Sequence, residues 1–164
     1  MKTILLLLIL FLFGLSAHSQ NNSLRSQAVF MEIKGSGVNL TINYDSRFVK
    51  KSNGFGGRVG VGFFGDRWQK AFNLPVEINY LIGNRFHFLE LGTGIVWGNY
   101  DEISDDQKGF ADAYLTPLDG FGFNLNIGYR YQKPERIMFK LNFTPLFTTS
   151  KIYHLAGISC GYSF

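Results

Sequence analysis

Two histidines, His87 and His154, are the side chains beyond residue 20 best suited to proton transfer near neutral pH. A histidine can activate a serine for acyl transfer when a carboxylate orients its ring. His154 closely follows Ser150, and in the expected fold it shares one end of the molecule with an acidic stretch within residues 98–119. His87 belongs to the opposite end. His154 is therefore the one candidate base, although no His-x-Ser pairing supports it.

A glycine motif raises the question of a nucleotide cofactor. Residues 60–65 read GVGFFG and match the pattern G-x-G-x-x-G. A dinucleotide site needs that motif between a strand and a helix. Here the motif lies within and at the end of a strand pattern, and no helical periodicity follows it. We therefore expect no cofactor.

The stretch from Gly98 to Asp119 is the most polar in the chain. Its carboxylates lack the spacing of an EF-hand and its final glutamate. We expect a solvated loop and no metal site, with weak binding of divalent cations as the alternative. The acidic residues are Asp101, Glu102, Asp105, Asp106, Asp112 and Asp119.

The N-terminus predicts export. Lys2, an apolar run over residues 4–13, and the small residues Ala17 and Ser19 are typical of a signal peptide spanning residues 1–19. A membrane anchor is the alternative, but the run is shorter than the roughly 20 residues that a spanning helix needs. The net charge of +4 includes Lys2 and is too small to indicate nucleic-acid binding. Cys160 is the only cysteine, so no internal disulfide forms.

Beyond residue 26 the recurring pattern is alternation of apolar and polar residues, which is the period of a β-strand. After a lead-in over residues 20–27, a single domain is expected over residues 28–164. Most of its strand segments approach the 9–11 residues that a tilted strand needs to cross a bilayer. The segments are 28–35, 37–48, 54–64, 72–82, 86–97, 120–131, 136–147 and 154–164. Short turns alternate with longer loops between them, except that the first connection is also short.

Each segment has one apolar and one polar face. In the sixth, Phe123, Leu125 and Ile127 alternate with Asn124 and Asn126. The second segment is expected to carry Val38 on its apolar face. The polar faces collect nearly balanced charges, which we expect to pair in the narrow interior of an eight-stranded barrel. This expected lumen charge network comprises Glu32, Lys34, Asp45, Arg47, Arg58, Glu77, Glu90, Arg130 and Lys140.

A soluble sandwich or lipocalin-like barrel would show the same alternation with its apolar face inward. The aromatic residues favour a membrane barrel because they gather at both ends of the segments, as interfacial girdles do. One group is Tyr44, Phe48, Tyr80, Tyr129, Tyr131, Tyr162 and Phe164, and the other is Trp68, Phe72, Trp97, Phe121 and Phe147. The expected fold is all-β, an eight-stranded antiparallel up-and-down transmembrane barrel.

The stretches LPVEINYLIGNRFHFLELGTG, IGYRYQKP and AGISCGYSF resemble small outer-membrane β-barrel proteins of Bacteroidetes bacteria, of the outer-membrane protein A and X type. The resemblance implies that Tyr162 and Phe164 form the C-terminal signal read by the barrel-assembly machinery. Pro75 and Pro145 depart from the pattern because proline interrupts a strand ladder. A bulge or an early strand end is expected at each.

These observations predict a non-enzymatic integral protein of the outer membrane that stabilises the membrane or displays its loops. Outer-membrane lipids, lipopolysaccharide and the barrel-assembly machinery are the expected partners, and a monomer is expected. One alternative is an enzyme that modifies lipid A or phospholipid, with His154 as its base. A second alternative is a narrow channel, which the strand count and the inward charges disfavour.

Overall fold

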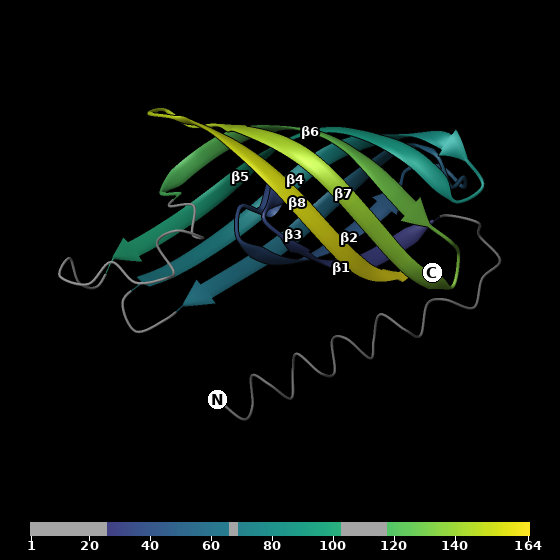
Figure 1. Ribbon diagram of the computed structural model, residues 1–164, viewed down its shortest axis with the longest axis horizontal. Helices are drawn as coiled ribbons and strands as arrows, with labels where there is room; N and C mark the ends of the chain where they lie inside the picture. The colour runs from purple at the N-terminus through teal and green to yellow at the C-terminus, as the bar shows by residue number, and fades with distance from the viewer. Residues whose placement is uncertain (1–25, 66–68, 103–117) are drawn as a thin grey trace, which may run out of the picture.

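A computed structural model describes residues 26–65, 69–102 and 118–164. Within them the chain forms a closed barrel in which each strand pairs antiparallel with the next and β8 pairs with β1 (Figure 1). The predicted fold class is confirmed. The strands are β1 Gln27–Ile33, β2 Leu40–Arg47, β3 Gly54–Gly65, β4 Gln69–Asn84, β5 His87–Glu102, β6 Gly120–Gln132, β7 Arg136–Phe147 and β8 Ile152–Ser163. None of the helices in these ranges has the length and hydropathy to cross a bilayer.

The two ends of the barrel differ. Residues 48–53, 85–86 and 133–135 form the short connections at one end, which we call the turn end. Gln27 and Phe164 also meet there, and each backbone N–H donates to the other residue's carbonyl at 3.0 Å. The opposite end, the loop end, carries the connections that contain residues 66–68 and 103–117. The predicted signal peptide, Trp68 and most of the acidic stretch fall outside the described residues.

Alternation of side chains separates two surfaces. Along β6 the buried residues are the even-numbered ones, including Asn124, Asn126 and Arg130, whereas Phe123 and Leu125 are exposed. The polar face is therefore the interior, and the apolar face is the outside. This arrangement is the reverse of a soluble barrel, in which the apolar residues fill the core.

Pro75 and Pro145 interrupt the ladder without ending a strand. Pairing between β3 and β4 stops after Val59↔Val76 and resumes at Gly62↔Asn73 in the same register. The β6–β7 ladder shows the same gap opposite Pro145. No residue is added, so the expected bulge or strand end is wrong. Pro75 still pairs with β5, and Pro145 still pairs with β8, because the missing N–H would have bonded to the strand on the opposite side.

The barrel wall is uneven because β1 and β2 have 7 and 8 residues, whereas β4 and β5 have 16 each. β1 pairs with β8 only as far as Ile158, and β2 pairs with β3 only as far as Gly62. Toward the loop end, the neighbouring parts of β8 and β3 have a partner strand on one side only. The wall therefore has a notch between β8 and β3.

Next to this notch, the connection between β1 and β2 turns into the interior of the barrel. We call residues 34–39 the inturned loop. Its 3-10 turn, η1 (Gly35–Gly37), is fully buried and lies against β1 and β3 to β8. This placement explains why the first connection is short although it belongs to the loop end. Val38 was expected on the apolar outer face, and that expectation is wrong: the residue is fully buried in the interior.

Candidate functional site

The interior of the barrel holds eight buried charged side chains among the described residues, four cationic and four anionic. Each lies on the inward face of a strand, because inward positions recur at every second residue. The set is Glu32, Asp45, Arg47, Arg58, Glu77, Glu90, Arg130 and Lys140, all at most 2% exposed. It is formally neutral, as an enclosed group of charges must be to avoid a large desolvation cost.

The first half of this network, nearer the turn end, is centred on Asp45. Arg47 Nη2 lies 2.6 Å from Asp45 Oδ1, and Arg130 Nη2 lies 3.2 Å from the same oxygen. Asn79 Nδ2 donates to Asp45 Oδ2 at 2.6 Å. Arg130 also reaches Glu90 Oε2 at 3.2 Å. One carboxylate thereby joins strands β2, β4 and β6 across the lumen.

A glycine makes room for this half. A Cβ atom on Gly56 would stand 2.1 Å from Arg47 Cζ, so no other residue fits there without moving the guanidinium. The glycine-rich face of β3 therefore holds the long side chain of β2 in place.

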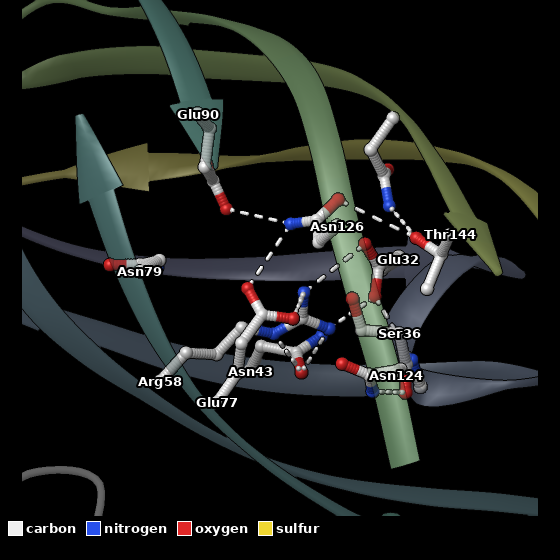
Figure 2. A network of polar contacts seen from close by, with 12 residues as sticks. Glu32, Ser36, Asn43, Arg58, Glu77, Asn79, Glu90, Asn124, Asn126 and Thr144 are labelled. Carbon is white, nitrogen blue, oxygen red and sulfur yellow. Dashed lines mark hydrogen bonds and ion pairs between the residues drawn. The ribbon is translucent and has the colours of Figure 1, made fainter. Parts of the chain in front are cut away.

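The second half is centred on Arg58 (Figure 2). Its guanidinium binds both carboxylate oxygens of Glu32 and donates from Nε to Asn43 Oδ1 at 3.1 Å. Arg58 Nη1 also lies 3.9 Å from Glu77 Oε2. Asn126 Nδ2 donates to Glu77 at 3.1 Å and to Glu90 at 3.2 Å, which connects this half to the first.

Lys140 contacts a carboxylate of each half of the network. Its Nζ lies 2.7 Å from Glu90 Oε1 and 3.9 Å from Glu32 Oε1. Buried pairs of this kind add little net stability because both charges lose their water, but an unpaired member is costly. We infer that these side chains form a neutral network that connects opposite strands across the lumen.

Phe30 is an interior residue beside the charges that the sequence pattern did not single out. It is 1% exposed, and its ring lies 5.2 Å from Arg58 Cζ, 5.8 Å from Arg130 Cζ and 5.8 Å from Lys140 Nζ. An aromatic face so placed attracts all three cations. The sequence offered one signal for this position. Phe30 is two residues before Glu32 in the same strand, so both side chains point to the same face.

Lys34 is not one of the fully buried charges. It lies just beyond β1 at the start of the inturned loop, is half-buried, and has a positive φ of 62°. Without it, four cations balance four anions. The strand ends one residue earlier than its polar alternation indicates, because the chain turns into the lumen at Lys34.

The inturned loop covers the network toward the loop end. Gly37 N–H donates to Glu32 Oε2 at 3.3 Å, and Asn124 Nδ2 donates to the carbonyl of Ser36 at 3.5 Å. Beyond the loop, an apolar cluster fills the interior. Its buried members are Val38, Val96, Leu118, Leu146 and Leu155. The lumen is therefore ionic at its middle and apolar toward the loop end.

Val38 is held in a strained backbone conformation. Its φ is 73° and its ψ is −54°, and Asn39 N–H donates to the carbonyl of Gly37 at 2.9 Å. These values describe a γ-turn with positive φ, which is rare and strained, and more so for a β-branched residue. The bonds of the loop to Glu32 and Asn124 hold this strain in place.

Replacing Val38 by glycine is expected to destabilise the barrel less than replacing it by alanine. Both changes remove buried carbon atoms, but only glycine adopts a positive φ freely. At an ordinary strand position the order is reversed by roughly 0.5–1 kcal/mol. Denaturant unfolding of both variants measures the difference. Val96→Gly and Val96→Ala, in the regular strand β5, are the matched controls and should show the ordinary order.

The histidines lie on the outer surface. The ring of His154 stacks on Phe143, with centroids 6.0 Å apart and planes 4° apart. Its register partner in β7 is Pro145. His87 Nδ1 lies 2.6 Å from the hydroxyl of Tyr129 at the turn end. Among the described residues, neither imidazole is joined to a serine and a carboxylate, and no three His, Cys, Asp or Glu side chains gather as a metal site requires.

The remaining sequence motifs lie on the wall. The GVGFFG stretch is part of β3, with no helix after it in the described residues. Cys160 is exposed on the outer face of β8. Tyr162 is 50% and Phe164 42% exposed on the same outer face, where β8 closes against β1. Asp101 and Asp119 are exposed at the loop end, Glu102 is the last residue of β5, and the other carboxylates of the acidic stretch lie outside the described residues.

Comparison with solved structures places this geometry among known folds. The barrel is similar to the N-terminal β-barrel domain of Pseudomonas aeruginosa OprF, with a TM-score of 0.59 and 14% identity over 85% of this chain and 96% of that one. The fold is that of an outer-membrane β-barrel. Weaker likenesses are to the Yersinia pestis outer membrane protein Ail (TM-score 0.49, 11% identity, 85% and 98% covered) and to the outer membrane enzyme PagL (0.45, 13%, 84% and 98%). No protein-family model and no curated sequence matches the chain.

Proposed function

We propose that the chain is an integral outer-membrane protein that has no enzymatic activity and stabilises the membrane or displays its loops. The observation that carries this proposal is the combination of an apolar outer face with a neutral, ion-paired lumen. A barrel with this distribution keeps its charged strand residues away from the acyl chains and has no open interior to conduct solutes. The similarity to the OprF domain supports the barrel fold on which this proposal depends. Tyr162 and Phe164 then act as the assembly signal.

Purified protein in planar bilayers is expected to show little stable conductance. The ionic network, the inturned loop and the apolar cluster occupy the lumen in succession from the turn end. Single-channel recording measures this directly, with protein-free bilayers as the control. A large and steady current through the wild type would contradict the plugged lumen and favour the channel alternative.

Deletion of the gene is expected to change outer-membrane permeability while the masses of lipid A and phospholipids stay the same. His154 stacks on Phe143 and, within the described part of the chain, lies in no serine–carboxylate set. Mass spectrometry of extracted lipids, alongside a dye-uptake assay, measures both properties. Lipid masses that change on deletion, and are restored by the wild type but not by His154→Ala, would favour the enzyme alternative.

A further inference from the structure

The turn end of the barrel carries a concentration of positive charge. Each of its three short connections, or the residue next to it, supplies a cation. We call Lys50, Lys51, Arg85, Lys133 and Arg136 the basic rim. Four are exposed and Lys133 is half-buried, and Glu135 is the one acidic side chain in the same described turns. The side-chain charge of this end is therefore five positive against one negative.

The loop end lacks this excess of positive charge. The side chains described there are two cations and two anions, Lys70, Lys151, Asp101 and Asp119. The seven ion pairs of the lumen include none of the side chains of the basic rim. Glu135 is the one carboxylate side chain in the described turns, so the basic rim keeps a net positive charge. Its charge is directed outward, toward whatever surrounds this end of the barrel.

Apolar side chains adjoin the cations in each connection. Val49 precedes Lys50 and is 51% exposed, and Ile137 follows Arg136 and is 54% exposed. Phe86 follows Arg85, and Lys133 Nζ lies 5.3 Å from the centre of its ring. A cation next to an exposed apolar body suits a membrane interface, where the stem contacts acyl chains and the charge reaches the headgroups. A soluble anionic partner would not require this pairing.

Aromatic residues mark the same level on the barrel wall. Tyr80 packs edge-on against Phe55 at 4.6 Å between ring centres, and His87 contacts both Tyr129 and Tyr131. Amphipathic rings prefer the headgroup region of a bilayer. The basic rim lies just beyond these rings, toward the turns, where lipid phosphates would be.

We propose that the basic rim binds the phosphate groups of anionic phospholipids in the leaflet at the turn end. This inference rests on the proposed membrane location. Each basic side chain near an anionic membrane surface strengthens attraction about fivefold, and salt screens the effect. The partner is a lipid headgroup with a net negative charge, such as phosphatidylglycerol, in preference to a zwitterionic headgroup.

Spin-labelled lipids test the proposal. The full-length folded protein is placed in phosphatidylcholine bilayers that contain a trace of labelled phosphatidylglycerol or labelled phosphatidylcholine. Electron spin resonance then gives the relative association of each lipid with the protein. We expect the wild type to prefer phosphatidylglycerol severalfold, and we expect 1 M salt to reduce this preference.

Two charge-reversal variants distinguish an effect of the basic rim from an effect of the net charge of the protein. Lys50→Glu/Lys51→Glu is expected to lower the preference about twofold or more. Lys70→Glu/Lys151→Glu makes the same change in net charge at the loop end and should retain most of the preference. Equal losses in both variants, or no preference in the wild type, would overturn the proposal. Failure of the wild type to insert at all would instead overturn the membrane location, and the rim proposal with it.

Discussion

Arg58→Met is expected to destabilise the barrel by about 3–5 kcal/mol, the cost of removing one partner from a buried ion pair. Methionine keeps much of the volume but leaves the lumen with four carboxylates and three cations. Glu77 then has no cation within 4 Å among the described residues, and Glu32 retains only Lys140, at 3.9 Å. Denaturant unfolding of the folded protein in bilayers or bicelles measures the change.

Two further variants separate this cause from a general loss of packing. Arg58→Met combined with Glu32→Gln restores neutrality and should recover part of the stability, because paired groups are coupled in a double-mutant cycle. Lys51→Met removes a cation from the exposed turn end and should change stability by about 0.5 kcal/mol or less. Similar effects for Arg58→Met and Lys51→Met would show that the network is hydrated and carries little energy.

Leu125→Arg is expected to oppose folding into bilayers by about 2–4 kcal/mol, the cost of a cation at the membrane midplane. Leu125 lies halfway along β6 and is 44% exposed on the outer face. Ile137→Arg makes the same kind of change beside the turn end, where the cost falls to about 0–1 kcal/mol. Each variant is refolded by dilution of the denaturant in the presence of bilayers. Gel migration of unboiled samples at each denaturant concentration then gives the folded fraction.

The order of the two variants is the informative result. A soluble barrel would accept arginine at either exposed position, and Leu125→Arg would then fold as well as Ile137→Arg. Equal tolerance at both sites would therefore contradict the membrane location, although the barrel fold itself would stand.

The strands could be predicted because their signal is local. Alternation with period two depends on neighbouring residues, so the bounds of β7 agree with the prediction, and the faces of β6 follow from parity alone. The inward charges could be grouped for the same reason. Which charge meets which could not be predicted, because Arg130 contacts Asp45 across 85 positions of sequence.

The inturned loop could not be predicted because its signal contradicts the local pattern. Val38 continues the alternation of Leu40 and Ile42 and would lie outside in an extended strand. Only the closed barrel supplies the interior contacts, from Val96 and Leu146, that compensate for its unfavourable φ. The extension of β4 and β5 beyond their expected ends likewise depends on their pairing with each other over 16 residues.

The seam between β1 and β8 joins the two ends of the described chain, and this has a kinetic consequence. Seven pairings, from β1–β2 to β7–β8, can form between strands that are neighbours in sequence, whereas β1 meets β8 only after nearly all of the polypeptide is in place. Contacts between such distant residues are entropically expensive and slow. Until closure, the curled sheet exposes two unpaired edges that invite pairing with other chains. The late step in building this molecule is therefore expected to be the meeting of its ends, and a chain truncated before β8 would retain both edges.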